Sequence, residues 1–486
     1  MLSAELSYGA QLLTGVSKNN IRVEPLNGGP GGIGAQQIIS FQLPTAAVID
    51  MRTLKLSMAV QTFGADGTPS VGEARLPPRA DSLIESYSVV MGGITVFDSG
   101  VHYNSLCHLY GKFTEEHMLD FALGHPEMVR YLSYVDGGGN GLIPPATLGA
   151  QNLCEGYSPQ SNRIALCIDK WRGFFQAAPR LFNTALVPPI TINYVLASNS
   201  VLTSSAGSEN NAPTEANSFA KDGALGCTFK LYNTRLNVDV FSIANQAYTD
   251  MLTQRMSDLG HLTVPFESWT SSINTHTGAT LFSTSSSSLD KIITIFRKPS
   301  YATQKAPVTA FGFKDSVANV TDAAGNNAGN MGMISQLDRG GTARLNNNCE
   351  RWLSTYFQHT LEANPANSYP LMQYTINSSA FPQYQANPLE VFGLTKDCFD
   401  VPMDPCDQMS LKMFESDYFA FGVRLNLPNS SFSRLQSGLD TRSMAASCQL
   451  VTQNVGDTNG QASVVIYAIN TSLLKIGFGR TLEVVS

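Results

Sequence analysis

The chain is short of charged residues. Only 14% of its 486 residues are Asp, Glu, Lys or Arg, whereas soluble proteins usually contain about 25%. This scarcity argues against a coiled coil, whose helix surfaces are rich in Glu and Lys. The hydrophobic share of 43% is that of a globular protein, and it excludes intrinsic disorder, which needs low hydrophobicity with high net charge. The surface must therefore consist largely of neutral Ser, Thr, Asn and Gln.

Signals for nucleic acid, membranes and export are also missing. The net charge is −7, and the first twenty residues contain a single cation, Lys18, so no basic arm is available to bind nucleic acid. No apolar run approaches the roughly 18 residues of a membrane-spanning helix. The first residues lack the cationic and apolar stretches of a secretory signal. We therefore expect no direct sequence-specific nucleic-acid binding and no membrane span.

Paired cysteines are absent as well. The eight cysteines are scattered, and none belongs to a Cys-x-x-Cys pair. Such pairs are typical of zinc sites, and disulfide frameworks are typical of small secreted domains. The pattern favours reduced, mostly buried thiols.

The dominant hydrophobic period is two. In the clearest run, Phe419, Phe421 and Val423 alternate with small or polar residues. Because successive side chains of a strand point to opposite faces, each such run has one apolar and one wetter face. This pattern is typical of sheets packed face to face. The alternating runs are 39–43, 53–63, 190–196, 236–240 and 419–427.

Turn signals separate these runs, and helical periodicity is confined to three places. Gly92-Gly93 divides two alternating segments, and such a pair favours a hairpin turn with positive φ. Helices are predicted within 102–124, in a short segment ending by Gly260, and within 345–356. Because βαβ units would need a helix between every pair of strands, we interpret these helices as insertions in an all-β chain.

A division near residue 246 gives two halves of similar size. Residues 36–246 and 247–486 could each hold about eight strands, which suits a two-sheet jelly roll. Residues 1–35 are predicted to form an N-terminal arm, because they are Gly-rich and lack strand alternation after Val23. The Ser-, Asn- and Ala-rich stretch 198–228 is predicted to be a long exposed loop.

One glycine-rich stretch matches the sequence of a dinucleotide-binding motif but not its structural context. Residues 29–34 match G-x-G-x-x-G, and Asp50 lies near the position of a ribose-binding acid. A dinucleotide site needs these glycines to open a helix whose N-terminus holds the pyrophosphate. Residues 35–44 instead have a strand pattern that ends at a proline. We therefore interpret the stretch as an arm that enters the first strand.

Four histidines cluster in sequence without the spacing of a metal site. They are His102, His108, His117 and His125. Catalytic zinc usually binds a His pair four residues apart on a helix or two apart on a strand. We interpret them as histidines of an amphipathic helix. The carboxylates at 115–116 point to different sides of any helix and make a poor acid–base pair.

No catalytic motif stands out. The sequence has no Gly-x-Ser-x-Gly elbow, Walker loop or His-Glu-x-x-His motif. Trp171, Phe174, Phe175, Tyr248 and Trp269 lie in or beside the alternating runs, so they are predicted to be core residues, not base-stacking platforms. We expect no catalytic, cofactor-binding or metal-binding residues, no cofactor, and no enzymatic activity.

Several segments, taken in order, resemble the double jelly-roll major capsid proteins of DNA viruses, especially those of virophages and polinton-like viruses. The most specific piece is the series Ser82-Leu83-Ile84-Glu85, then Gly92-Gly93, then Tyr103-Asn104 with Leu106. No single motif is diagnostic, but the order and spacing span roughly residues 35–480. The resembling segments are 39–44, 50–56, 80–85, 92–96, 103–106, 182–196, 236–252, 437–442 and 464–476.

The resemblance implies two tandem eight-stranded jelly rolls with a few inserted helices. It further implies a major capsid protein whose homotrimers form pseudo-hexameric capsomers of an icosahedral shell around a double-stranded DNA genome. Its partners would be other copies of itself, a penton protein, and minor or cement capsid proteins. Its location would be the virion capsid, assembled inside the infected host cell.

Two other classes remain open on the sequence. A carbohydrate-binding or hydrolytic β-sandwich would have paired carboxylates about 5–9 Å apart and exposed aromatics in a groove. A trimeric spike or fibre would show short repeats along a shaft, and the sequence contains no such repeats.

Overall fold

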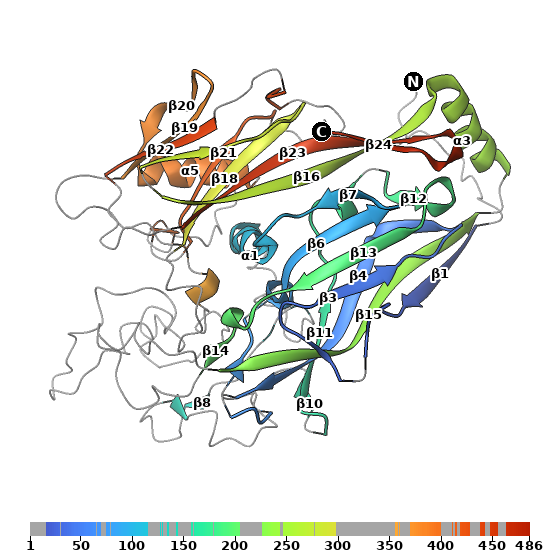
Figure 1. Ribbon diagram of the computed structural model, residues 1–486, viewed down its shortest axis with the longest axis horizontal. Coiled ribbons are helices and arrows are strands. Elements are labelled where there is room, and N and C mark those ends of the chain that lie inside the picture. The colour runs from blue at the N-terminus through green and yellow to red at the C-terminus, as the bar shows by residue number, and fades with distance from the viewer. Residues whose placement is uncertain are drawn as a thin grey trace, which may run out of the picture.

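The computed structural model describes residues 16–114, 157–204, 226–297, 370–399 and 438–486 apart from short gaps, and parts of 127–143, 355–359 and 411–427. Its main sheets fall into two groups, which we call the first lobe (residues 16–243) and the second lobe (residues 261–485). Among the described strands, none of one lobe pairs with a strand of the other. Figure 1 shows the second lobe above the first, with helix α3 (Gln246–Leu259) at one end of the molecule.

The first lobe consists of a large and a small antiparallel sheet. The large sheet has the order β1-β15-β4-β11-β10, with β12 beside β4 and β2 beside β15, and the small sheet has the order β3-β13-β6-β7. The large-sheet strands are β1 (Val16–Val23), β2 (Ile33–Gly34), β4 (Val48–Phe63), β10 (Tyr157–Ser158), β11 (Arg163–Ile168), β12 (Leu181–Asn183) and β15 (Thr228–Ile243). The small-sheet strands are β3 (Ile38–Gln42), β6 (Ile84–Met91), β7 (Ile94–Asp98) and β13 (Ile190–Leu196).

Two short antiparallel strand pairs accompany these sheets. They are β5 (Ala74–Arg75) with β14 (Thr203–Ser204), and β8 (Tyr134–Val135) with β9 (Leu142–Ile143).

The second lobe repeats the two-sheet arrangement. Its large sheet has the order β16-β23-β18-β21, with β24 beside β23, and its small sheet has the order β17-β22-β19-β20. The large-sheet strands are β16 (His261–Thr275), β18 (Leu289–Arg297), β21 (Ala420–Arg424), β23 (Ser463–Gly477) and β24 (Leu482–Val485). The small-sheet strands are β17 (Ala279–Phe282), β19 (Leu371–Ile376), β20 (Ser379–Ala386) and β22 (Cys448–Gln453).

The core of the first lobe lies between its two sheets. On β4, alternate residues from Leu54 to Val60 are buried, and the residues between them are more exposed. Trp171 links the sheets, because its Nε1 donates to the Leu54 carbonyl at 3.1 Å and its ring packs 4.8 Å from that of Tyr194 on β13. Burying each large apolar side chain contributes about 1.5–3 kcal/mol. Face-to-face packing therefore follows from the period-two pattern.

Many sequence predictions are confirmed. The run 190–196 coincides with β13, 53–63 lies inside β4, and 236–240 lies inside β15. Gly92 and Gly93 make the turn between β6 and β7 with φ values of 58° and 87°. The predicted core aromatics Trp171, Phe174, Phe175 and Trp269 are buried, and Tyr248 is half-buried.

The expectation of one wet face was wrong for β21 of the second lobe, where every residue from Ala420 to Val423 is buried. The cause is helix α5 (Pro388–Cys398), in which the hydroxyl of Thr395 donates to the Ala420 carbonyl at 2.9 Å and accepts from the Gly422 amide at 3.0 Å. Alternation along a strand cannot reveal a helix that covers its other face.

The observed helices agree only in part with those predicted from the hydrophobic periodicity. The first predicted helix is α1 (Tyr103–Thr114), and the second is α3, which ends one residue before Gly260. The third lies mostly outside the described residues, where Tyr356 sits in the short 3₁₀ helix η9 (Thr355–Phe357). Helix α5 was not predicted, although Asn387 and Glu390 form a capping box at its start.

The region predicted as an arm contributes to the first lobe. Residues 16–23 form β1, which pairs with β15 in full register from Val16↔Ile243 to Val23↔Leu236. Residues 33–34 form β2 beside β15, and residues 38–42 continue as β3, so no helix follows the glycine motif. This confirms the strand expected after the glycine motif, in the place where a dinucleotide site would need a helix N-terminus for the pyrophosphate.

Two further expectations fall partly outside the described residues. Of the predicted loop 198–228, the structure describes both ends, including the buried Val201 and Leu202. Cys107, Cys227, Cys398 and Cys448 are buried free thiols and Cys167 is half-buried, as predicted for those five. No helix within the described part of the chain is long and apolar enough to cross a membrane.

Candidate functional site at the seam between the lobes

Helix α1 belongs to the first lobe but is enclosed by both lobes. Eleven of its twelve residues are buried, so it is not the amphipathic helix expected from the sequence. Tyr103 lies 5.1 Å from the Tyr87 ring of the first lobe and 5.3 Å from the Trp269 ring of the second. A helix that is buried on all sides lies between two packed bodies. We call the contact region around α1 the seam.

Aromatic side chains fill the seam. Tyr110 stacks on Trp269 at 6.4 Å and meets Phe399 edge-on at 4.4 Å. Phe113 stacks on Phe399 at 4.7 Å. Aromatic pairs contribute roughly 0.5–1.5 kcal/mol beyond the area that they bury. The packing around α1 therefore resists separation of the lobes.

A second aromatic contact lies beside the first. Phe266 on β16 meets Phe97 of β7 at 6.5 Å and Phe174 at 5.3 Å. Phe174 belongs to the short 3₁₀ helix η4 (Phe174–Gln176) of the first lobe. Strand β16 thus packs on the first lobe at two places along its length, through Phe266 and Trp269.

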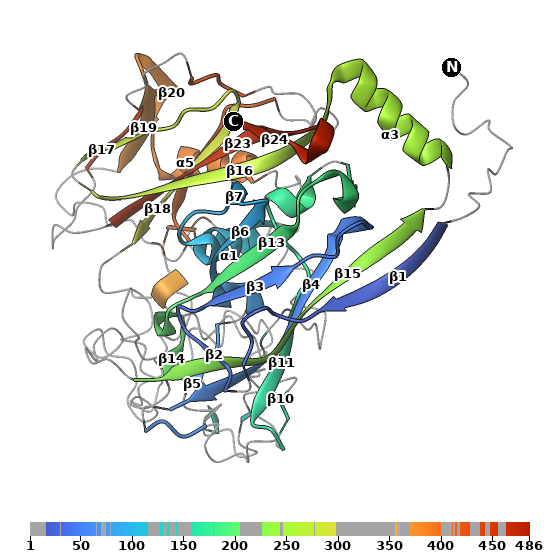
Figure 2. The same cartoon turned by 45° about the vertical axis from the view of Figure 1, so that its right-hand side comes forward.

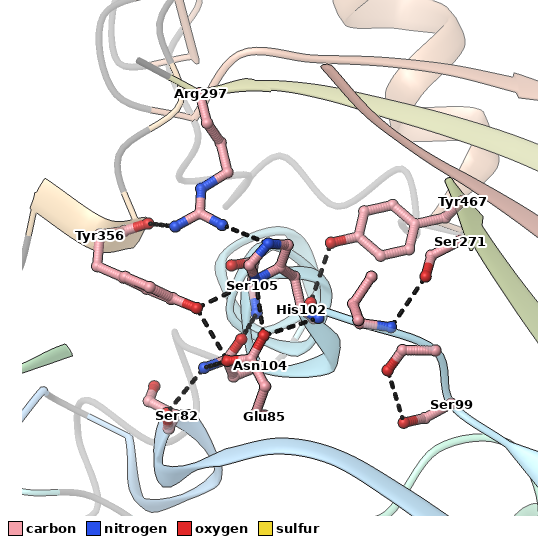
Figure 3. A network of polar contacts seen from close by, with 12 residues as sticks. Ser82, Glu85, Ser99, His102, Asn104, Ser105, Ser271, Arg297, Tyr356 and Tyr467 are labelled. Carbon is pink, nitrogen blue, oxygen red and sulfur yellow. Dashed lines mark hydrogen bonds and ion pairs between the residues drawn. The ribbon is translucent and has the colours of Figure 1, made fainter. Parts of the chain in front are cut away.

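A polar network crosses the seam at the start of α1 (Figure 3). Its centre is Glu85 on β6, whose Oε1 lies 2.7 Å from His102 Nδ1 and accepts from the His102 amide at 3.0 Å. The Oε2 atom of Glu85 accepts from the Tyr356 hydroxyl at 2.9 Å and from Asn104 Nδ2 at 3.3 Å. Tyr356 reaches this first-lobe carboxylate from η9, 271 positions later in the chain.

His102 is held from the other side by the second lobe. Arg297 Nη1 lies 3.0 Å from His102 Nε2, and the Tyr467 hydroxyl donates to the His102 carbonyl at 2.9 Å. Because a guanidinium can only donate, Nε2 must accept and the proton of a neutral ring must lie on Nδ1, facing Glu85. The Ser271 hydroxyl accepts from the Val101 amide at 2.9 Å. Strands β16, β18 and β23 thereby all bond to the turn before α1.

The network stabilises the charged form of Glu85. Burial raises the pKa of this carboxyl, but the hydrogen bonds that it accepts from the ring and amide of His102 and from Tyr356 outweigh burial and hold the pKa below its ordinary value. Burial and the nearby Glu85 charge raise the pKa of Tyr356. At neutral pH, Glu85 is therefore an anion that binds donors from both lobes.

The side chains of two further histidines are buried in the seam. His108 and His359 are 0% exposed, and within the described residues neither ring has a hydrogen-bond partner. The His108 ring stacks 4.9 Å from that of Phe357. Burial lowers the pKa of His108 well below its ordinary value and that of His359 to about 3. Both rings are neutral at pH 7, and that of His108 packs against the rings of Phe357 and Tyr418.

A buried charge cluster lies at the first-lobe side of α1. Arg79 Nη2 lies 2.8 Å from Asp81 Oδ2, and both side chains are almost fully buried. Burial and the negative charge of Asp81 raise the pKa of nearby Glu127 to about 8. The 3₁₀ helix η2 (Ala80–Leu83), which carries Asp81, packs beside α1. This cluster therefore packs against α1 on its first-lobe side.

The four histidines of the sequence cluster do not meet at one site. His102 lies in the polar network and His108 in the aromatic packing, while His117 and His125 lie outside the described residues. Within the described part of the chain, no group of three or more His, Cys, Asp or Glu side chains could hold a metal ion.

The sequence series that resembled capsid proteins maps onto the seam. Asn104 Nδ2 donates to the Ser82 carbonyl at 3.1 Å as well as to Glu85. Residues 82–85 and 103–106 therefore form one hydrogen-bonded unit. Arg297, Tyr356 and Tyr467 were missed, because nothing near them in sequence connects them to residues 85–104.

Comparison with known proteins establishes the fold. No protein-family model and no curated protein sequence matches the chain. Among solved structures, the Faustovirus major capsid protein matches with a TM-score of 0.54 at 10% identity, covering 97% of this chain and 92% of that one. PBCV-1 VP54, from a crystal structure fitted into a cryo-EM reconstruction of the virophage Sputnik, matches with a TM-score of 0.55 at 12% identity, covering 99% of both chains. A chain from the quasi-atomic model of the PBCV-1 virus capsid gives 0.52 at 12% identity, covering 98% of this chain and 99% of that one.

The chain therefore has the double jelly-roll fold, and the resemblance inferred from the sequence is confirmed at the level of the fold. Each lobe is one jelly roll with two facing antiparallel sheets. The large sheets contain additional short strands beyond the expected eight per lobe, such as β2 and β10.

Proposed function

We propose that the protein is a major capsid protein whose homotrimers are the pseudo-hexameric capsomers of an icosahedral shell around double-stranded DNA. The observation that carries this proposal is the likeness to the Faustovirus major capsid protein, which extends over 97% of this chain. Both lobes and the seam between them therefore belong to the shared architecture.

The seam explains how such a chain can act as one building block. Two similar lobes in one rigid chain give two similar wedges, and three chains give six wedges around a threefold axis. Such a block can tile a shell only if its lobes keep a fixed angle. The aromatic packing around α1 and the bonds from Arg297, Tyr356 and Tyr467 to residues 85–102 supply that rigidity.

The composition suits repeated burial between copies. Neutral polar side chains lose much less free energy on desolvation than charged ones do. A trimer interface of this kind should bury on the order of 2,000–5,000 Å². Contacts between trimers can be weaker, because several neighbours hold each block together.

The remaining assignments belong to the same proposal. We divide the chain into an N-terminal arm (1–35), a first jelly roll (36–246) and a second jelly roll (247–486), with residues 16–23 and 33–34 of the arm adding strands β1 and β2 to the large sheet of the first jelly roll. We expect a penton protein and minor or cement proteins as partners, assembly inside the infected cell, and a structural, non-enzymatic role in the virion. Cofactors, metals and sequence-specific nucleic-acid binding have no part in this function.

Sedimentation of the purified protein tests the proposal. We expect a species of three times the 52.4 kDa chain mass, with no DNA affinity that falls linearly with log salt. A monomer at all accessible concentrations, or a steep salt slope of DNA binding, would contradict it.

A further inference from the structure

The large sheet of the first lobe concentrates positive charge in an acidic chain. Its four principal strands β1, β4, β11 and β15 carry seven cations and two anions, a net charge of +5. The whole chain has a net charge of −7, which leaves −12 for the remaining residues. The cations are Lys18, Arg22, Arg52, Lys55, Arg163, Lys230 and Arg235, and the anions are Asp50 and Asp239.

Strand register brings several of these cations onto one face. Arg22 on β1 pairs with Asn237 on β15, which pairs with Lys55 on β4. Adjacent strands lie about 4.8 Å apart, so Arg22 and Lys55 are separated by one strand. Both are exposed, because the alternate residues of β4 and β15 face the core. We call the outward side of β1, β15, β4 and β11 the basic face.

The basic face lies on the side of the first lobe away from the second lobe. Figure 2 shows β1 and β15 along this outer side, far from the second-lobe sheets. No seam contact described above uses it. Among the described residues, the face is therefore available to a partner outside the chain.

The pattern of charges on this face suits a protein surface better than a phosphate backbone. Lys18 is bound to Asp239 at 2.6 Å, Arg235 lies 3.3 Å from Glu24, and Arg163 lies 3.7 Å over the Tyr232 ring. Neutral residues separate the cations along each strand. Polyanion binding depends on many unpaired cations that each replace a counterion, whereas protein interfaces use a mosaic of paired and unpaired charges.

We propose that the basic face docks an acidic surface of a second copy of this chain. Two basic faces would repel one another, so the contact is heterologous, with different surfaces of the two copies meeting. Heterologous contacts can repeat from copy to copy. The proposal rests on the proposed function and assigns the basic face to contacts between trimers.

Charge reversal with a matched control tests it. The variant Arg22→Glu/Lys55→Glu/Lys230→Glu changes three exposed side chains of the basic face. The control Arg255→Glu/Arg442→Glu/Lys475→Glu lies on α3 and the second lobe and gives the same net charge of −13. Each substitution changes the charge by −2. Association of purified trimers is measured by sedimentation equilibrium at low and high salt.

We expect the face variant to weaken association between trimers about tenfold or more at low salt, with a much smaller effect at high salt. The control should change it less than threefold or so. Equal weakening by both variants, or no salt-dependent association of the unmodified trimer, would overturn the proposal. If the charge-reversal variant unfolds at a lower temperature than the unmodified protein, Arg22→Gln/Lys55→Gln/Lys230→Gln provides the same comparison without new carboxylates.

Two outcomes separate this inference from the function on which it rests. A monomeric wild-type protein would refute the capsomer proposal, whatever the face variant does. A trimer whose basic face binds a short DNA duplex, with that binding lost in the face variant and association between trimers unchanged, would refute the docking proposal alone.

Discussion

The large sheets of the two lobes are built alike but have different surroundings. Each centres on two long paired strands, β4 with β15 in the first lobe and β16 with β23 in the second, all of 15 or 16 residues. In the second lobe, α5 covers the outer side of β21, and Phe266 and Trp269 of β16 pack on first-lobe aromatics. In the first lobe, the outer side is exposed and basic.

The two large sheets also differ in their charged residues. The five strands of the second-lobe sheet carry four cations and three anions, close to balance. Three of these charges, Asp290, Lys291 and Arg297, are buried. One sheet therefore fixes the chain internally, and its counterpart is free to contact neighbours. The following predictions test this contrast, from the largest expected effect to the smallest.

Removing Phe399, the aromatic residue that follows α5 and packs on α1, should have the largest effect. Phe399→Ala deletes a ring that touches both Tyr110 and Phe113 of α1. We expect the free energy of unfolding to fall by about 3–5 kcal/mol, because a cavity opens in the seam. Urea denaturation measures this. Leu389→Ala, at an exposed position of α5, should cost no more than about 0.5 kcal/mol, and equal losses would contradict the seam's role.

Neutralising the centre of the polar network should cost less. Glu85→Gln keeps the shape of the side chain but removes the anion that accepts from His102, Tyr356 and Asn104. We expect a loss of about 1–3 kcal/mol in the free energy of unfolding, discounted because the site is partly exposed. Glu483→Gln at the surface pair with Lys475 is the control. A loss no larger than that of the control would show that the network does not hold the lobes.

Acid should weaken the seam through its buried histidines. The pKa values of His108 and His359 are lowered by burial, the latter to about 3, so the unfolded chain binds more protons below about pH 6.5. Their contribution to stability is complete above pH 6.5 and is lost as the pH falls towards 3, at up to about 1.4 kcal/mol per pH unit for each ring.

The variant His108→Phe isolates this effect. It should keep the stacking on Phe357 and reduce the dependence of stability on pH between 6.5 and 5. Urea midpoints of both proteins across this range provide the measurement. Parallel curves for the two proteins would exclude His108 from the acid response.

Loosening the helix that covers the second sheet should have the smallest effect. Asn387 accepts from the Glu390 amide at 3.1 Å and caps α5. Asn387→Ala should lower stability by about 1 kcal/mol, and Asn387→Ser should restore most of it. Hydrogen exchange of the β21 amides should accelerate in the alanine variant. An unchanged exchange rate would mean that the Asn387 cap does not affect how firmly α5 covers β21.

Local patterns predicted local structure well. The alternation in 190–196 needs no knowledge of distant residues, and β13 matches it residue for residue. The Gly92-Gly93 turn likewise depends on backbone freedom at two positions. The double jelly roll, by contrast, was inferred from a family resemblance, because alternation alone does not fix which strands pair.

Only the first-lobe residues of the seam could be predicted from the sequence. The residues 82–85 and 103–106 were singled out by resemblance, and they are bonded to each other. Their second-lobe partners are 195 and 271 positions away, as for Arg297–His102 and Tyr356–Glu85. A single sequence carries no signal for such a pairing. The burial of β21 on both sides was hidden for the same reason, since the helix that covers it, α5, comes from another part of the chain.

Cryo-electron microscopy of the purified 486-residue chain shows whether its two lobes form one rigid unit of a capsomer. We expect a threefold particle with six similar lobes in a pseudo-hexagonal ring, each pair of lobes joined through α1 at a fixed angle. Isolated two-lobed subunits, or particles in which the two lobes take many relative orientations, would contradict it.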